Sequence, residues 1–165
     1  MLLVDVAGGE GHDNDVFHHA FPDASGKLVL QDLGPIIDNI KSLDKAITRD
    51  KHDFFAKQTI TGARAYYFRQ IFHDWPDKEC IHILKNIAEA MKAGYSKLII
   101  FEWVLPVKDV PLYPALLDIN MMAVLNGMER TESQWEALLN HAGLKVVKFW
   151  KTDCESEGLI EAVLI

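Results

Sequence analysis

The residue types that could do chemistry in this sequence are a histidine after an apolar run and a glycine loop near the start. His73 follows the apolar run 63–72 and precedes Asp74-Trp75-Pro76. A neutral imidazole, with a pKa of about 6.5, is a usable proton acceptor at neutral pH. A histidine at the end of a strand can also be satisfied by its own loop. His73 is therefore either a general base or a turn residue.

The glycine loop, "VDVAGGEGHD", follows a short apolar run and precedes a helical pattern. Small residues there let the backbone approach a ligand, and free N–H groups at a helix start favour an anionic group. The dinucleotide fingerprint G-x-G-x-x-G fails, because the third position after Gly9 and Gly11 is Asn14, and no Lys-Ser/Thr follows for a P-loop. Asp32 ends the next apolar run and can either accept hydrogen bonds from ribose hydroxyls or cap the following helix. The loop and Asp32 together favour a nucleoside site.

Alternating strand and helix patterns must position these residues. The strands are predicted at residues 2–6, 28–32, 65–71, 97–103, 144–150 and 159–165, with a weak strand at 47–50. Helical patterns cover residues 11–21, 34–40, 77–91, 114–125 and 131–143, with Asp77 and Thr131 as expected N-caps and Gln134 completing a capping box with Thr131. The order predicts one α/β domain over residues 1–165, with a mostly parallel sheet, a central first strand and an antiparallel C-terminal hairpin.

Composition excludes several classes of function. The net charge is -7 and no basic stripe is present, which argues against nucleic acid and anionic membranes as partners. No run approaches the ~20 apolar residues of a membrane helix, and the first residues lack the pattern of a signal peptide. Cys80 and Cys154 are far apart, so we expect neither a disulfide framework nor a zinc site but a reducing, cytoplasmic location. The other histidines show no metal spacing, and no metal is predicted.

Several longer stretches resemble one known family. They are "LVDVAGGEGHD", "FPDASGKLVLQDL", "HDFF", "GARAYYFRQIFHDWPDKECIHILKNIAEAMKAGYSKLIIFEWVLP" and "LDINMMAVLNGMERTESQWEALLNHAGLKVVKFW". In this order they are similar to the S-adenosylmethionine (SAM)-dependent O-methyltransferases of the plant caffeate and fungal secondary-metabolism type. The resemblance covers nearly the whole chain. It implies the Rossmann-like sheet of class I methyltransferases, SAM as the cofactor, and a phenolic hydroxyl of a small aromatic or polyketide-like metabolite as the methyl acceptor.

The resemblance also implies a role for individual residues. His73 would be the general base, and Glu102 and Glu129 would orient or polarise it. The cofactor would be bound by the glycine loop, which contains Gly8, Gly9 and Gly11. Asp32 would hold its ribose, Asp53 and Phe54 would contact its adenine, and Arg69 would lie near its carboxylate. The acceptor pocket would be lined by Asn120, Met121 and Met122, although methionines in "NMMAVL" are as readily explained as core.

Two departures from the family pattern qualify this interpretation. Ala7 stands where the family usually has its first glycine. Family members carry an N-terminal helical dimerisation domain, whereas this sequence begins at the first strand, so we expect a partly open pocket and an apolar face that self-association or a protein partner covers. Three hypotheses follow: a small O-methyltransferase, a methyltransferase-fold enzyme that catalyses cyclisation, isomerisation or decarboxylation, or a non-catalytic accessory subunit.

Overall fold

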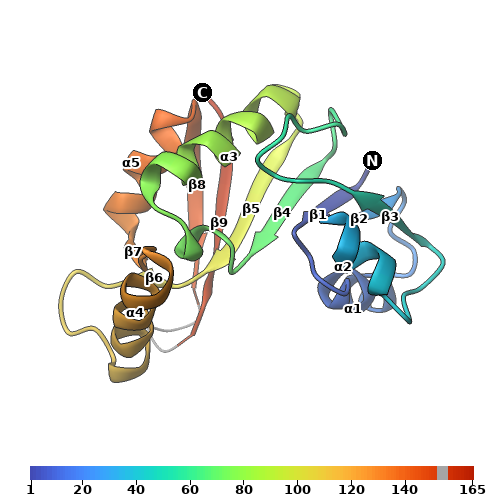
Figure 1. The fold of residues 1–165 in the computed structure, drawn as a ribbon. Helices are drawn as coiled ribbons and strands as arrows, with labels where there is room; N and C mark the ends of the chain where they lie inside the picture. Colours follow the sequence, from blue (N-terminus) through green and yellow to red (C-terminus); the bar gives the residue numbers. More distant parts are fainter. Residues whose placement is uncertain (152–155) are drawn as a thin grey trace.

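The structure, a computed structural model, describes residues 1–151 and 156–165, and its centre is one seven-stranded sheet (Figure 1). The order of the strands is β3-β2-β1-β4-β5-β9-β8. Their bounds are Leu3–Val6 (β1), Leu28–Asp32 (β2), Ile47–Lys51 (β3), Ala65–Arg69 (β4), Lys97–Glu102 (β5), Leu144–Trp150 (β8) and Gly158–Leu164 (β9). Strands β1 to β5 are mutually parallel, whereas β9 is antiparallel to both β5 and β8. This confirms the predicted α/β class, the single main sheet and its antiparallel hairpin.

A second, two-stranded sheet was not predicted. It pairs β6, Val104–Leu105, with β7, Arg130–Thr131. Each strand has only two residues, which is too short for an alternating pattern to reveal. The pairing places the segment that contains Glu129 beside the end of β5.

The helices follow the predicted positions closely. They are His12–Ala20 (α1), Gly34–Asn39 (α2), Asp77–Ala90 (α3), Leu112–Leu125 (α4) and Glu132–His141 (α5), with a 3₁₀ turn at Phe72–Asp74 (η1). Thr131 and Gln134 form the predicted capping box of α5. The prediction for Asp77 was wrong, because Pro76 is the N-cap of α3 and Asp77 is its first residue. The Asp77 carboxylate instead accepts hydrogen bonds from Arg130.

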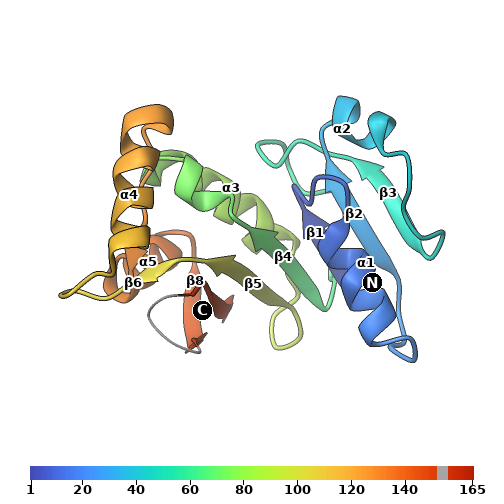
Figure 2. The same ribbon diagram turned by 90° about the horizontal axis from the view of Figure 1, so that it is seen from below.

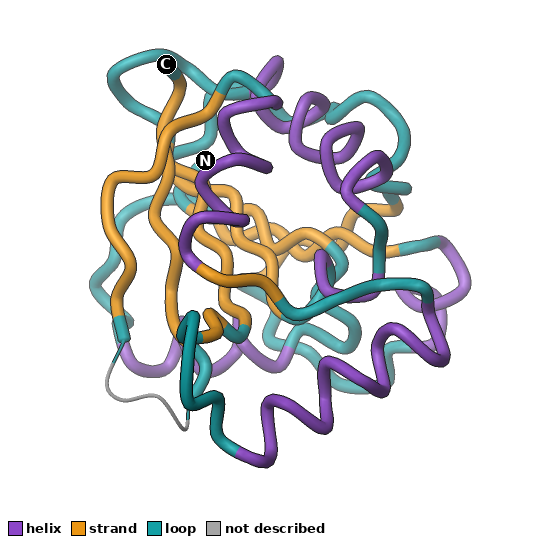
Figure 3. Tube along the Cα trace, turned by 90° about the vertical axis from the view of Figure 1, so that its left-hand side faces the viewer, coloured by secondary structure: helices purple, strands orange, loops and turns teal. Residues whose placement is uncertain are grey.

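The helices cover the sheet from two sides and create two hydrophobic cores. The larger core packs α3 and α5 against β1, β4, β5 and β9, and its members include Tyr66, Phe68, Ile83 and Trp135. The smaller core packs α1 and α2 against β2 through Leu30, Ile37 and Phe17. Figure 2, seen from below, and the tube of Figure 3 show the strands between these helices, with α4 apart from the sheet at one end of the molecule. Opposite faces are used because the chain moves from β1 to β3 in one direction and from β4 to β5 in the other.

The reversal of strand order lies between β1 and β4. In open parallel sheets the carboxyl ends of the strands diverge at such a point and leave a crevice where ligands bind. The glycine loop follows β1, Asp32 ends β2, and the turn with His73 follows β4. The sheet therefore brings the predicted cofactor-binding and catalytic residues together at the carboxyl ends of its central strands.

An apolar groove of about 510 Å³ lies on the side of the sheet that carries α1. Val16 and Phe17 of α1 and Phe21, its C-cap, line it together with Leu3, Tyr67 and Phe101 of the sheet. Parallel strands are normally covered on both faces, whereas in this groove, called here the α1 groove, apolar residues of β4 and β5 line an open surface. In residues 1–151 and 156–165, no helix is both long and apolar enough to cross a bilayer.

Candidate active site

His73 lies in the 3₁₀ turn that follows β4, and its side chain is bound to an acid from a distant segment. Its Nδ1 is 2.8 Å from Oε1 of Glu129, and only 8% of His73 is exposed. An Nδ1–H group that donates to this carboxylate leaves the lone pair on Nε2. Nε2 lies 3.4 Å from Oδ1 of Asp74. In this orientation Nε2 is the ring nitrogen that can accept a proton.

The acids around His73 raise the pKa of its imidazole. Burial lowers this pKa, but the hydrogen bond with Glu129 and the negative charges of Glu102, Glu129 and Asp74 outweigh burial and raise it above the ordinary 6.5. The pKa of the neighbouring Asp74 is also raised, because burial disfavours its charged form, although the positive charge of His73 opposes this shift. A base with a raised pKa accepts a proton more strongly, at the expense of a smaller neutral fraction at pH 7.

Glu102, predicted to polarise His73, contacts the backbone beside it rather than the imidazole. Its Oε1 accepts hydrogen bonds from the N–H groups of Ile71, at 3.0 Å, and Phe72, at 2.6 Å. Burial raises the pKa of Glu102 to about 7, against the opposing charge of His73 and these two N–H groups. Glu102 thus fixes the start of the 3₁₀ turn that carries His73 and adds negative potential near the imidazole.

Arg130 is a site residue that sequence reasoning missed. It is 1% exposed, and its guanidinium donates to the backbone oxygens of Phe72 and Trp75, each at 2.9 Å, and to Asp77. These contacts enclose the turn on both sides of His73. The only local signal was its place next to Glu129 in "GMERT".

The chain also approaches the turn at Phe72–Asp74 closely at Gly127. The N–H of Met128 donates to the oxygen of His73 at 3.0 Å, and a Cβ at position 127 would lie 1.9 Å from that oxygen. The N–H of Glu129 donates to Asp118 of α4 at 2.8 Å. Residues 127–130 therefore need a glycine where they touch the turn, and they place Glu129 opposite the imidazole.

The glycine loop forms the second half of the site. Gly9 donates its N–H to Oδ2 of Asp32 at 2.8 Å, while Oδ1 of Asp32 accepts the N–H of Leu33 at 2.7 Å. Asp32 thus contacts both the loop and the start of α2, and each carboxylate oxygen retains a free lone pair for a ribose hydroxyl. Ala7 has a φ of 59°, in the left-handed region, which explains why a glycine is usual at its position.

Asp5 is a buried acid below the loop that the sequence reasoning did not select. A Cβ at Gly8 would lie 2.5 Å from its carboxylate, and its Oδ2 has no hydrogen-bond partner. Burial, with the charges of Asp13 and Asp32, raises the pKa of Asp5 to about 7. An unpaired buried carboxylate is costly, and a cationic group bound at the loop would offset that cost. The site therefore fits a nucleoside ligand that also carries a positive charge.

The segment with Asp53 and Phe54 follows β3 beside Asp32, where the N–H of His52 donates to the oxygen of Asp32 at 2.9 Å, and it is attached to α3. Asp53 turns the chain by accepting the N–H of Phe55 at 2.9 Å. Asn86 of α3 donates to the oxygens of Phe54 and Phe55 at 3.2 and 3.1 Å. The ring of Phe54 packs near Trp75, with 6.2 Å between the ring centroids. This segment is therefore connected, through the contact of Phe54 with Trp75, to the end of the turn that carries His73.

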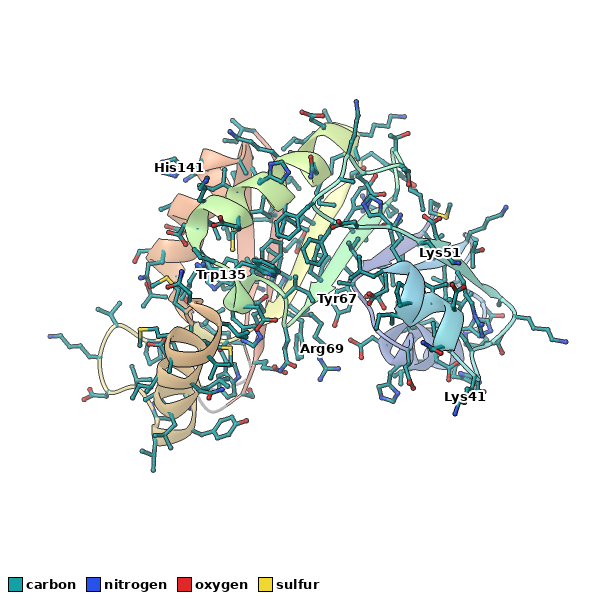
Figure 4. The ribbon with its side chains drawn as sticks, in the orientation of Figure 1. Lys41, Lys51, Tyr67, Arg69, Trp135 and His141 are labelled. Atoms are coloured by element: carbon teal, nitrogen blue, oxygen red, sulfur yellow. The ribbon has the colours of Figure 1, made fainter. Side chains whose placement is uncertain are left out.

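Arg69, the predicted contact for the cofactor carboxylate, is paired with an acid of α1. Its Nη1 lies 2.8 Å from Oδ1 of Asp13, whose Oδ2 accepts the hydroxyl of Tyr67 at 2.9 Å. Figure 4 shows Tyr67 and Arg69 at the carboxyl end of β4, next to the half of the molecule that holds α1 and α2. The Arg69 side chain is partly exposed, so its guanidinium remains accessible to a carboxylate.

The predicted acceptor-binding residues lie on α4, apart from the α1 groove. Met121 is buried and its oxygen accepts the N–H of Gly127, whereas Asn120 and Met122 are exposed. Their contact with an acceptor stays a prediction. Among the described residues, no group of histidine, cysteine and acidic side chains could hold a metal ion. Cys80 is a free, buried thiol, and Cys154 lies outside the described residues.

Comparisons with known proteins show which family the chain resembles. A family model described as an O-methyltransferase domain matches residues 1–145. The O-methyltransferase asqD of Emericella nidulans is 45% identical over 99% of this chain and 43% of its own length. The structure of LepI in complex with SAM superimposes with a TM-score of 0.94 at 32% identity, over 99% of this chain and 43% of that one. A structure described as a pericyclic reaction enzyme gives the same TM-score, identity and coverage. The chain spans less than half the length of these relatives.

Proposed function

The chain belongs to the O-methyltransferase domain family, and from this premise we propose that it transfers a methyl group from SAM to a phenolic hydroxyl of a small aromatic or polyketide-like secondary metabolite. One observation supports this most strongly. The buried His73–Glu129 pair lies at the carboxyl ends of the strands, where the glycine loop and Asp32 also lie. That is where a base and a cofactor must meet for an oxygen to be methylated.

Each residue then has a defined part in the reaction. Nε2 of His73 takes the proton of the acceptor hydroxyl, and Glu129 holds the tautomer and stabilises the imidazolium that forms. Glu102 and Arg130 hold the turn that aims His73. A phenol has a pKa of about 10, so proton removal is needed before it becomes a good nucleophile at neutral pH. Such a base contributes roughly 10²–10⁴-fold to the rate.

The cofactor would be held by residues on the other side of the crevice. We propose that Asp32 accepts the ribose hydroxyls, Asp53 and Phe54 contact the adenine, and Arg69 contacts the carboxylate. Gly8, Gly9 and Gly11 let the backbone approach the remaining part, above Asp5. When bound, SAM supplies an activated methyl group on a sulfonium. The chain contributes position and charge, and an in-line arrangement can add more to the rate than the base does.

A second candidate is a methyltransferase-fold enzyme with a different reaction. The similarity to a pericyclic reaction enzyme, at a TM-score of 0.94 and 32% identity, favours keeping it. Cyclisation or isomerisation would need the shape and charges of the crevice but no methyl transfer. Calorimetric titration with SAM, followed by mass-shift assays on phenolic acceptors, tests the proposal. A mass gain of one methyl group supports methyl transfer, whereas binding of SAM with an isomerised product favours the second candidate.

Replacement of Asp32 by asparagine should weaken cofactor binding. The amide keeps one acceptor oxygen but loses the charge and the second acceptor, so we expect the Kd for SAM to rise about tenfold or more, which equals ~1.4 kcal/mol. The matched control is Asp38→Asn, because Asp38 is an exposed acid paired with Lys51 on the surface. Titration calorimetry on both variants measures the effect. Equal affinity of Asp32→Asn and the unchanged protein would remove Asp32 from the cofactor site.

We propose further that a second copy of the chain or a protein partner covers the α1 groove. The face of β4 and β5 within it is apolar and uncovered, which is unusual for parallel strands. We expect light scattering to show a mass that grows with concentration. We expect Val16→Glu to suppress that growth, because Val16 lines the groove and is 54% exposed, so the new charge lies in the groove and not in a core. A strictly monomeric mass at high concentration, with no captured partner, would contradict this proposal.

A further inference from the structure

Two buried glutamines connect the two cofactor-binding segments. Gln31 and Gln58 are 0% and 2% exposed, and their side-chain amides exchange hydrogen bonds in both directions. Nε2 of Gln58 donates to Oε1 of Gln31 at 2.8 Å, and Nε2 of Gln31 donates to Oε1 of Gln58 at 3.0 Å. Burying two amides is unfavourable unless every polar atom is satisfied, so this pair requires one mutual geometry.

The orientation of both amides is set by partners outside the pair. The second N–H of Gln31 donates to Oδ2 of Asp50 at 2.8 Å, and a carboxylate only accepts. Oε1 of Gln58 also accepts the N–H of Ile60 at 3.0 Å, and only an oxygen can do this. Neither amide can be turned over without losing a hydrogen bond.

Gln31 is connected to the glycine loop and to the ribose acid. It directly precedes Asp32 on β2, and its backbone oxygen accepts the N–H groups of Ala7, at 2.8 Å, and Gly8, at 3.2 Å. Its side chain points away from Leu30, which packs in the smaller core. Gln31 is therefore a fixed point on the face of β2 that no helix of that core covers.

Gln58 belongs to a segment without regular secondary structure. Residues 53–64 contain no helix or strand. The N–H of His52 donates to the oxygen of Asp32 at 2.9 Å and fixes the start of the segment, but beyond that point side-chain hydrogen bonds hold Phe54 and the residues after it. Asn86 attaches the segment to α3 at Phe54 and Phe55. Gln58 attaches it to β2. Without Gln58, the stretch between His52 and Ile60 would keep its contacts with α3 but would lose its side-chain contact with β2.

We propose that the Gln31–Gln58 pair is a positioning element that sets Asp53 and Phe54 at a fixed distance from Asp32 and thereby determines affinity for the adenine nucleoside part of the cofactor. This inference rests on the proposed function, because it assumes an adenine nucleoside between these residues. Neither glutamine touches the ligand. Each acts through the backbone of the segment that does.

The sharpest test is Gln58→Glu at two pH values. A protonated carboxyl group at this position can donate to Oε1 of Gln31 and accept from its Nε2, which reproduces the pair. The ionised form has no donor and adds a negative charge near Asp50. Burial raises the pKa of a carboxyl group, so the switch should occur well above pH 4.5. We expect the ratio of the Kd for S-adenosylhomocysteine, variant over unchanged protein, to be near one at pH 5.5 and about ten or more at pH 8.

Three further measurements separate positioning from a merely structural role. Gln134→Glu makes the same change at the exposed start of α5, where glutamate also completes a capping box, and its Kd ratio should stay near one at both pH values. Gln58→Met, which cannot form the pair, should weaken binding equally at both pH values. The Kd for free adenosine should rise by the same factor as that for S-adenosylhomocysteine, because both ligands contain adenine and ribose.

The possible outcomes are distinct. Failure of the unchanged protein to bind either ligand contradicts the proposed function and this inference with it. Binding by the unchanged protein, with Kd ratios near one for Gln58→Met and for Gln58→Glu at pH 8, contradicts this inference alone, even if the melting temperature falls. A pH-independent ratio for Gln58→Glu also overturns it, since a restored pair is its specific consequence.

Discussion

His73→Gln should lower turnover by roughly 10²–10⁴-fold while the protein remains folded. Glutamine is close in size and can still donate a hydrogen bond to Oε1 of Glu129, so we expect the free energy of unfolding to change by ~1 kcal/mol or less. It cannot accept a proton at neutral pH. The Kd for SAM should remain unchanged, because the loss concerns the chemical step. Single-turnover rates, titration calorimetry and urea denaturation on one preparation measure all three quantities.

The pH dependence of the unchanged protein gives an independent check on His73. Only the neutral imidazole is a base, so the rate should fall as pH decreases through the His73 pKa, which lies above the ordinary 6.5. The contribution of His73 to the free energy of unfolding changes with pH in the opposite direction from the rate. A raised pKa in the folded state contributes stability that is present below pH ~6.5 and lost as pH rises through the folded pKa. The difference in unfolding free energy between the unchanged protein and His73→Gln should therefore be larger at pH 6 than at pH 9.

The matched control for this prediction is His141→Gln. His141 is exposed in the last turn of α5, where its Nδ1 contacts the oxygen of Ala137. Its replacement should leave turnover and the pH–rate profile unchanged. If His73→Gln lowered the melting temperature and spared the turnover, His73 would be a turn residue, which is the alternative that the sequence left open.

The strands and helices could be predicted well because their signals are local. The run 28–32 matches β2 and the run 144–150 matches β8. The aromatic strand was predicted two residues too long, because β4 ends at Arg69. Gln70 has a φ of 52° and Ile71 donates its N–H to Glu102, so the apolar run continues into the turn that carries His73. Burial behind that turn, rather than strand pairing, explains the apolar residues there.

Contacts between distant segments were beyond sequence reasoning. Asp77 has the residue type and position of an N-cap, but Arg130, 53 residues later, takes its carboxylate. The 56-residue separation of His73 and Glu129 contains no spacing rule, and only the family resemblance suggested the pair. Gln31 and Gln58 carry ordinary polar side chains, so their burial could not be inferred. Trp135 packs in the larger core, where it is 1% exposed and lies beneath the Arg130 guanidinium.

Replacement of Arg130 by methionine should cost about 3 kcal/mol or more of unfolding free energy. Methionine fills a similar length but donates no hydrogen bond, so the oxygens of Phe72 and Trp75 lose their guanidinium partner inside the protein. Asp77 loses its cationic partner as well. Because these contacts flank His73, turnover of the folded fraction should also fall, by about tenfold or more, through loss of position rather than of the base.

The choice of variants separates charge from geometry at position 130. Arg130→Lys keeps the charge, but a single ammonium cannot donate to two oxygens and a carboxylate with the guanidinium's planar arrangement, so it should recover only a small part of both losses. Arg49→Met is the control, since Arg49 is exposed and donates to a single backbone oxygen, that of Ile40, and its replacement should change stability by less than ~1 kcal/mol. Urea denaturation and turnover below the melting temperature decide the matter. Full activity and stability in Arg130→Lys would show that charge alone is sufficient, and unchanged turnover in Arg130→Met would show that Arg130 does not position His73.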